Sequence, residues 1–115
     1  MMPYGPESHV LEYKSQLPPT EKLARTLVAF ANSRGGRLVI GYDKSSDRIT
    51  GAKIDSKAEQ HLANIGHTVC KPSLEYTLKY ETLGDKTLTL IEVPEGIKNL
   101  IILVAKAEKL ALLSE

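Results

Sequence analysis

Residues 29–42, which read AFANSRGGRLVIGY, decide the fold. The first residues of this stretch are the last part of a pattern of apolar residues at helical spacing. This pattern predicts a helix over residues 20–33. Gly35 and Gly36 then supply the left-handed residue that commonly ends a helix. The continuous apolar run over residues 38–42 predicts a strand that is covered on both faces, and therefore a central strand of a sheet.

The chain before this helix predicts a short strand and a helix start. Residues 10–14 alternate between apolar and polar side chains, as in a half-buried strand. Pro18 and Pro19 end this strand. Thr20 stands where the N-cap of the helix is expected.

The chain after the central strand predicts a return strand, a second helix and an antiparallel hairpin. These elements are a turn at 44–47, a return strand over 48–51, a helix over 56–65 that ends near Gly66, and a hairpin of residues 74–81 and 87–93 joined at 84–86. The predicted fold class is α+β, a single domain in which two helices pack on a mixed, largely antiparallel sheet.

The composition is that of a small domain without strong charge. The chain of 115 residues has 15 basic and 14 acidic side chains and a net charge of +1. Any nucleic-acid binding must therefore rest on local clusters of charge. Cys70 is the only cysteine, which excludes an intramolecular disulfide and fits a reducing, cytoplasmic setting. The most apolar segment, residues 100–104, is too short to span a membrane, so no membrane partner is expected.

Three motifs in a fixed order carry a family resemblance. They are ESHVLEYK at residues 7–14, AFANSRGG at residues 29–36, and LVIGYD at residues 38–43, which is followed by ITG at 49–51. Over residues 7–96 the chain resembles the divergent AlbA domain of Schlafen proteins and of many bacterial and archaeal regulators. The resemblance implies a nucleic-acid-associated domain, with DNA or RNA as its partner.

The resemblance also implies a set of three carboxylates. In some Schlafen proteins such a cluster cleaves structured RNA with a divalent metal, and the matching residues here are Glu7, Glu12 and Asp43. Clustered carboxylates suit Mg²⁺ or Mn²⁺, which prefer oxygen ligands, and can hold the ion beside a phosphate. The alternative is that Glu7 and Glu12 are surface carboxylates paired with Lys14 or Arg37.

A basic rim around the two glycines is the expected contact surface for phosphates. The glycines let a phosphate approach the backbone closely, although a helix end requires glycine there in any case. Because the G-x-x-x-x-G-K-[ST] loop is missing, ATP binding is not expected. Tyr42 is a candidate for base stacking, but packing against the core is the favoured role. The predicted nucleic-acid-binding residues are Lys14, Arg34, Gly35, Gly36, Arg37, Lys44 and Arg48. The alternative is a set of solvated surface charges.

The histidines and the cysteine do not form a recognisable site. No pair among His9, His61 and His67 has the spacing of a helical metal site. Structural or surface roles are expected for all three. Cys70 is expected to be a small buried apolar residue rather than a nucleophile.

The C-terminal residues depart from the family pattern. Residues 1–96 are expected to form the divergent AlbA/Schlafen-type domain, and residues 97–115 an atypical tail with a strand at 100–104 followed by a helix. One hypothesis for the tail is a truncation or a change of reading frame. Another is that residues 100–104 pair with a second copy and form a homodimer.

Three functions stay open. The favoured one is a nucleic-acid-binding module with weak sequence specificity, as in a fragment of a transcriptional regulator. The rival is a metal-dependent endoribonuclease that uses Glu7, Glu12 and Asp43. The third is a non-catalytic interaction domain in which the motifs only build the fold.

Overall fold

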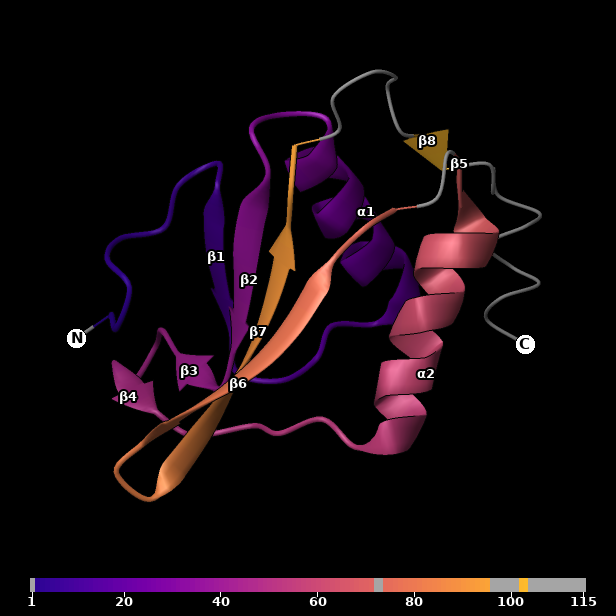
Figure 1. Ribbon diagram of the computed structural model, residues 1–115. Coiled ribbons are helices and arrows are strands. Elements are labelled where there is room, and N and C mark those ends of the chain that lie inside the picture. Colours follow the sequence, from indigo (N-terminus) through magenta and orange to yellow (C-terminus); the bar gives the residue numbers. More distant parts are fainter. Residues whose placement is uncertain (1, 72–73, 96–101, 104–115) are drawn as a thin grey trace.

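A four-stranded sheet lies at the centre of the computed structural model, which describes residues 2–71, 74–95 and 102–103 (Figure 1). Its strands are, in spatial order, β1 (Leu11–Lys14), β2 (Gly36–Ile40), β7 (Lys86–Val93) and β6 (Thr77–Leu83). β1 runs parallel to β2, whereas β2 with β7 and β7 with β6 are antiparallel. The predicted central strand is confirmed, because β2 lies inside the sheet and Leu38, Val39 and Ile40 are fully buried.

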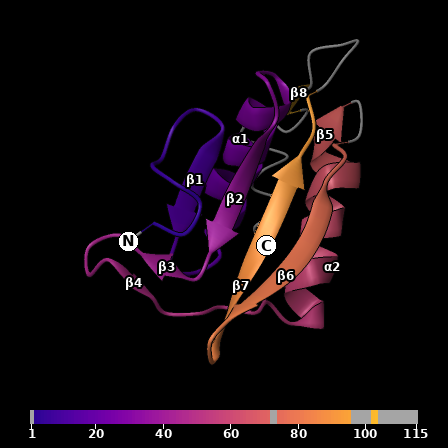
Figure 2. The ribbon, with the colours of Figure 1, turned by 60° about the vertical axis from the view of Figure 1, so that its left-hand side comes forward.

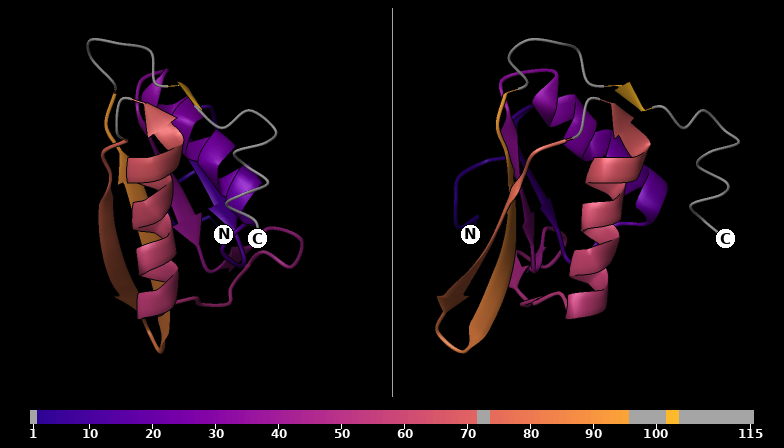
Figure 3. Two further views of the ribbon diagram at one scale, coloured as in Figure 1. Left: turned by 90° about the vertical axis from the view of Figure 1, so that its right-hand side faces the viewer. Right: turned by 45° about the vertical axis from the view of Figure 1, so that its right-hand side comes forward.

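Both helices cover the same face of the sheet. α1 (Thr20–Ala31) and α2 (Ser56–Asn64) lie on one side of the strands, as Figure 3 shows with the sheet seen nearly edge-on. Figure 2 shows β2, β7 and β6 next to one another with the helices behind them. The predicted α+β class, with two helices on a mixed and mostly antiparallel sheet, is confirmed.

The larger apolar core lies between the helices and the sheet. Side chains at helical spacing on α1 meet alternate residues of β2 and β7, which is the pairing that the two periodicities allow. Burial of each large aliphatic side chain contributes about 2 kcal/mol. The core residues are Leu23, Ala24, Leu27, Phe30, Ala31, Leu38, Ile40, Leu62, Ile65, Leu74, Ile91 and Val93.

A smaller core covers part of the opposite face. Here the short antiparallel hairpin of β3 (Tyr42–Asp43) and β4 (Arg48–Ile49) packs with N-terminal residues against the sheet. The Tyr13 hydroxyl holds the N-terminal residues in place, since it accepts from the Tyr4 N–H at 2.8 Å and donates to the Gly5 carbonyl at 2.7 Å. The buried members of this core are Tyr13, Val39, Tyr42, Leu88 and Leu90.

The start of α1 differs from the prediction. Thr20 is the first helical residue and not the N-cap, and Pro19 occupies the cap position without a side-chain hydrogen bond. The Thr20 hydroxyl instead lies 2.6 Å from Nε2 of His61 on α2. The predicted cap is therefore wrong, because a contact between the helices takes the side chain that local capping would use. The helix ends at Ala31, two residues before the predicted end at Ser33.

The end of the second helix also differs from the prediction. α2 ends at Asn64, one residue short of the predicted boundary, and the chain continues as the π-helical turn η1 (Ile65–Val69), which contains Gly66. Gly66 does not stop the helix. A Cβ on Gly66 would lie 3.1 Å from the carbonyl oxygen of Leu74, so the glycine permits a close approach of two backbone segments.

The C-terminal tail is described over two residues only. β8 (Ile102–Leu103) pairs antiparallel with β5 (Cys70–Lys71) of the same chain, within the predicted strand over 100–104. The helix predicted after this strand lies outside the described residues. Among the helices of the described part, none has the length and apolar character needed to cross a membrane.

Candidate functional site

The turn between α1 and β2 depends on its two glycines. Gly35 has a φ of +81°, and its N–H donates to the Phe30 carbonyl at 2.8 Å, which closes the helix end. A Cβ on Gly35 would lie 2.6 Å from the carbonyl oxygen of Val93. A Cβ on Gly36 would lie 2.2 Å from the Phe30 ring. Both glycines therefore have a packing role at this turn, whatever else approaches them.

Two arginines flank the same turn. Arg34 is exposed and has no ion pair within the described residues. Arg37 lies on the face of the sheet away from the helices, 2.9 Å from Glu92, with its guanidinium carbon 5.2 Å from the centre of the Tyr4 ring. The other oxygen of Glu92 lies 3.1 Å from Lys79. The Glu92 carboxylate thus pairs with two cations, Arg37 and Lys79. Arg34 has no carboxylate partner within the described residues.

A hollow lies between Arg37 and the N-terminal residues. Its volume is about 300 Å³, and it is lined by Tyr4, Val10, Leu11, Gly36, Arg37 and Glu92. Glu95, which follows β7 at this end of the sheet, is exposed. Glu92 and Glu95 are thus two acids near Arg34, Arg37 and Lys79.

The other predicted cations lie at the opposite end of β2. In the register of β1 on β2, Lys14 lies three residues further along the sheet than Arg37. This offset corresponds to roughly 10 Å. Lys44 and Arg48 lie in the β3–β4 hairpin beyond that end. The structure therefore brings Arg34 and Arg37 together and places Lys14, Lys44 and Arg48 apart from them, as a second group.

Glu7 and Glu12 each lie beside a lysine of this second group. The Lys44 Nζ is 3.1 Å from Glu7 and the Lys14 Nζ is 3.3 Å from Glu12. Glu7 also accepts a hydrogen bond from the Tyr13 N–H at 2.9 Å, on the outer edge of β1. Partial burial raises the pKa of Glu7, but the Tyr13 hydrogen bond and the charges of Lys44 and Lys14 outweigh it, so the pKa lies below its ordinary value.

Asp43 is held by the turn that follows it. One carboxylate oxygen accepts from the Ser45 hydroxyl at 2.8 Å and the Ser45 N–H at 3.1 Å, and the other accepts from the Ser46 hydroxyl at 3.0 Å. These hydrogen bonds, that of the Ser45 hydroxyl above all, lower the pKa of Asp43. Arg48 lies opposite Asp43 in the β3–β4 pairing, is exposed, and makes no ion pair within the described part of the chain.

The three predicted metal ligands do not converge in this arrangement. Among the described residues, no group of three histidine, cysteine, aspartate or glutamate side chains could hold a metal ion. Glu7 and Glu12 face lysines, and Asp43 faces its own serines. A divalent ion would require these side chains to exchange their partners, so the three-carboxylate site stays a prediction.

Tyr42 packs into the core and does not present its ring to a base. It is 2% exposed, and its ring centre lies 4.9 Å from that of Tyr13. The favoured role in the core is confirmed. The Tyr42 hydroxyl donates to Asp47, and this hydrogen bond, followed by burial, raises the pKa of Tyr42 to about 12.

Tyr42 makes the stability of the protein sensitive to alkaline pH. Because its pKa is about 12 in the folded state, against about 10 for an unfolded tyrosine, its contribution is complete below about pH 10 and is lost as the pH rises to about 12. Asp47→Asn should move the Tyr42 ionisation back toward its ordinary pKa. Ultraviolet titration of phenolate formation in wild type, Asp47→Asn and Tyr42→Phe measures the shift. An identical titration of wild type and Asp47→Asn would contradict the assigned cause.

Three residues at the α1–β2 end were not predicted from the sequence. They are Tyr4, Lys79 and Glu92. Glu92 pairs in register with Arg37, which puts both side chains on one face. Alternation along the hairpin indicates which hairpin residues share a face, but not that β7 pairs with β2.

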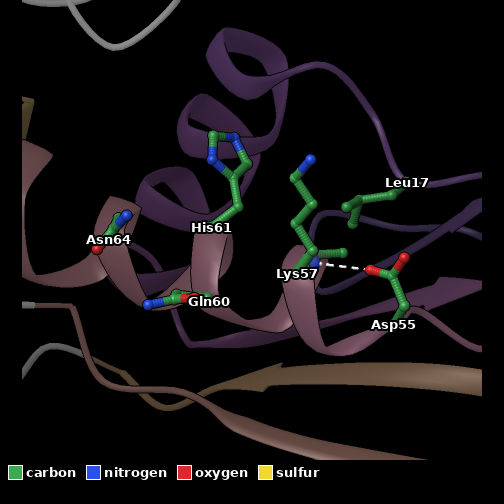
Figure 4. A pocket seen from close by; sticks show the side chains of 7 residues that line it. Leu17, Asp55, Lys57, Gln60, His61 and Asn64 are labelled. Carbon is green, nitrogen blue, oxygen red and sulfur yellow. Dashed lines mark hydrogen bonds between the residues drawn. The ribbon is translucent and has the colours of Figure 1, made fainter.

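A hollow of about 470 Å³ lies beside α2, away from the predicted site residues (Figure 4). The side chains of His61 and Lys57 project from the side of α2 on which Leu17 lies. Asp55 caps the helix by accepting from the Ala58 N–H at 2.8 Å. Since His61 contacts Thr20, it has the structural role expected for it.

Among the solved structures that share this fold are those of two bacterial proteins. One is the solution NMR structure of the N-terminal domain of a protein from Nitrosomonas europaea that is described as related to the ATP-dependent DNA helicase RecG. It is 23% identical, with a TM-score of 0.66 over 86% of this chain and 72% of that chain. The other, the DIP2311 protein from Corynebacterium diphtheriae, is 18% identical, with a TM-score of 0.54 over 81% of this chain and 19% of that chain. No curated protein sequence matches significantly.

A protein-family model matches most of the sequence. The family model described as Schlafen, AlbA_2 matches residues 7–110. The match includes the carboxylate motif of β1, the glycine pair after α1 and the strand that follows it. The chain therefore belongs to the Schlafen AlbA_2 family.

Proposed function

We propose that this chain is a nucleic-acid-binding module that contacts phosphates at the turn between α1 and β2. The observation that carries the proposal is the exposed Arg34, which has no ion pair within the described residues and lies near Arg37 at the glycine turn. Arginine contacts to phosphates position a nucleic acid but read no bases. Weak sequence specificity is therefore expected.

Two comparisons support this proposal. The resemblance to divergent AlbA domains implies an association with nucleic acid, and the chain belongs to that family. The Nitrosomonas europaea domain comes from a protein described as related to a DNA helicase. That likeness concerns the fold.

A binding panel tests the proposal. Purified protein is titrated against fluorescent duplex DNA, single-stranded RNA and folded tRNA at two salt concentrations, with and without Mn²⁺, and the products are run on a gel. Salt-dependent binding with intact products is the expected result. Mn²⁺-dependent fragments that disappear in Glu12→Ala would favour the endoribonuclease. A lack of binding to all three would favour a non-catalytic interaction domain.

Glu7→Gln is expected to raise nucleic-acid affinity about two- to fivefold at low salt, because it removes a negative charge and releases Lys44 from its ion pair. Anisotropy titrations at low and high salt measure the gain, which should shrink as salt screens it. Glu75→Gln is the matched control, since Glu75 is exposed and has no ion pair within the described segments. Equal gains in both variants would mean that Lys44 takes no part.

A further inference from the structure

A hollow of about 400 Å³ lies between α1 and the chain that leads into β1. Ligand sites commonly range from about 300 to 1,000 Å³. The lining combines apolar side chains of α1 with hydroxyl groups, one carboxylate, one imidazole and one guanidinium. Its residues are Ser8, His9, Glu12, Arg25, Thr26, Ala29, Phe30 and Ser33. Because Ser33 directly precedes Arg34, the hollow adjoins the proposed phosphate contact.

The carboxylate of Glu12, which lines this hollow, can accept further hydrogen bonds. One of its oxygens lies 3.3 Å from the Lys14 Nζ, and no other partner of the carboxylate exists within the described residues. About a third of the side chain, 32%, is exposed. An ionised carboxylate only accepts hydrogen bonds, and its two oxygens offer about four sites. A ligand that binds Glu12 must therefore present N–H or O–H donors.

We propose that the hollow binds one unpaired guanine base, whose N1–H and N2–H donate to the two oxygens of Glu12. Guanine alone among the common bases has two adjacent donors on its Watson–Crick edge, and this edge is free only in an unpaired nucleotide. The exposed methyl group of Ala29 offers an apolar contact to the flat base. The inference rests on the proposed function, since Arg34 would hold a phosphate of the same strand.

The carboxylates of the two hollows described above differ from Glu12. Glu92 binds Arg37 with one oxygen and Lys79 with the other. Asp55 caps α2 through the Ala58 N–H, in a hollow away from the α1–β2 turn. Glu12 has an oxygen without a partner within the described residues and lines a hollow that adjoins Arg34.

Three short labelled RNAs test the inference with the full chain. One contains uridine only, the second has one central guanosine, and the third has a central inosine, which lacks the N2 amino group. Fluorescence anisotropy should give about tenfold tighter binding for the guanosine RNA than for the uridine RNA, with inosine between them. This comparison uses the wild-type protein and so does not depend on the folding of a variant.

Two variants identify the residue responsible. Glu12→Gln should abolish the preference for guanosine while leaving the affinity for uridine RNA equal or higher, because a negative charge is lost. Glu75→Gln, at an exposed carboxylate outside the hollow, should keep the preference. Equal wild-type affinity for the three RNAs, or a guanosine preference that persists in Glu12→Gln, would overturn this inference alone. A lack of binding to all three RNAs and to duplex DNA would overturn the proposed function as well.

Discussion

Replacing Gly35 with alanine is expected to lower the free energy of unfolding by about 3 kcal/mol. The φ of +81° costs a residue with a side chain about 1–2 kcal/mol. In addition, the new Cβ would lie 2.6 Å from the carbonyl oxygen of Val93, so the end of β7 would have to move away from β2. Denaturant unfolding followed by circular dichroism measures the loss.

Gly84→Ala separates the two costs. Gly84 has a φ of +65° in the turn between β6 and β7, and a Cβ there would have nothing within 4 Å. Its replacement should cost only the backbone strain, about 1 kcal/mol. Equal losses in the two variants would show that contact with β7 contributes nothing at Gly35.

The double variant Arg34→Ala/Arg37→Ala is expected to bind duplex DNA about tenfold more weakly or worse. If each arginine neutralises one phosphate, the slope of log affinity against log salt should become shallower by about two. Arg34 makes no ion pair within the described part, and Arg37 shares Glu92 with Lys79, so neither cation has a carboxylate to itself. Anisotropy titrations at several salt concentrations measure both quantities.

A variant of equal charge controls for the field of the whole protein. Lys22→Ala/Lys57→Ala removes two exposed cations from α1 and α2, far from the glycine turn in the sequence, and should change affinity much less. If the arginine variant keeps its affinity and its salt slope, the α1–β2 turn is not the contact surface. Equal losses in both double variants would indicate attraction by net charge alone.

The elements that the sequence predicts well are those with local causes. The apolar periodicity of α1 and the unbroken apolar run of β2 each report burial directly, and both elements are present near the predicted residues. Gly35 was assigned to the helix end from its residue type, and its positive φ agrees. The β6–β7 hairpin follows from alternation and a glycine turn.

The errors come from contacts between distant residues. Thr20 is a good N-cap by local rules, but His61 on the other helix holds its hydroxyl. Gly66 has the residue type of a helix stop, yet it serves a close approach to Leu74. Neither partner can be identified from local sequence.

The division of the predicted basic rim has the same origin. The order of the motifs predicts that the basic residues form one cluster. The parallel register of β1 on β2 instead separates Lys14 from Arg37 along the strand. The partners of the carboxylates also depend on this geometry. Matching the sequence to the family motifs identifies Glu7 and Asp43. It does not show that Glu7 pairs with Lys44, or that Asp43 accepts a hydrogen bond from Ser45.

The most direct test of the proposed interface is a titration of isotope-labelled protein with a short DNA duplex and a short RNA, followed by backbone amide chemical shifts in NMR spectra at low salt. We expect the largest shifts at Arg34, Gly35, Gly36 and Arg37. Shifts confined to α2 and its hollow, or no shifts with either nucleic acid, would contradict the proposal that this turn contacts phosphates.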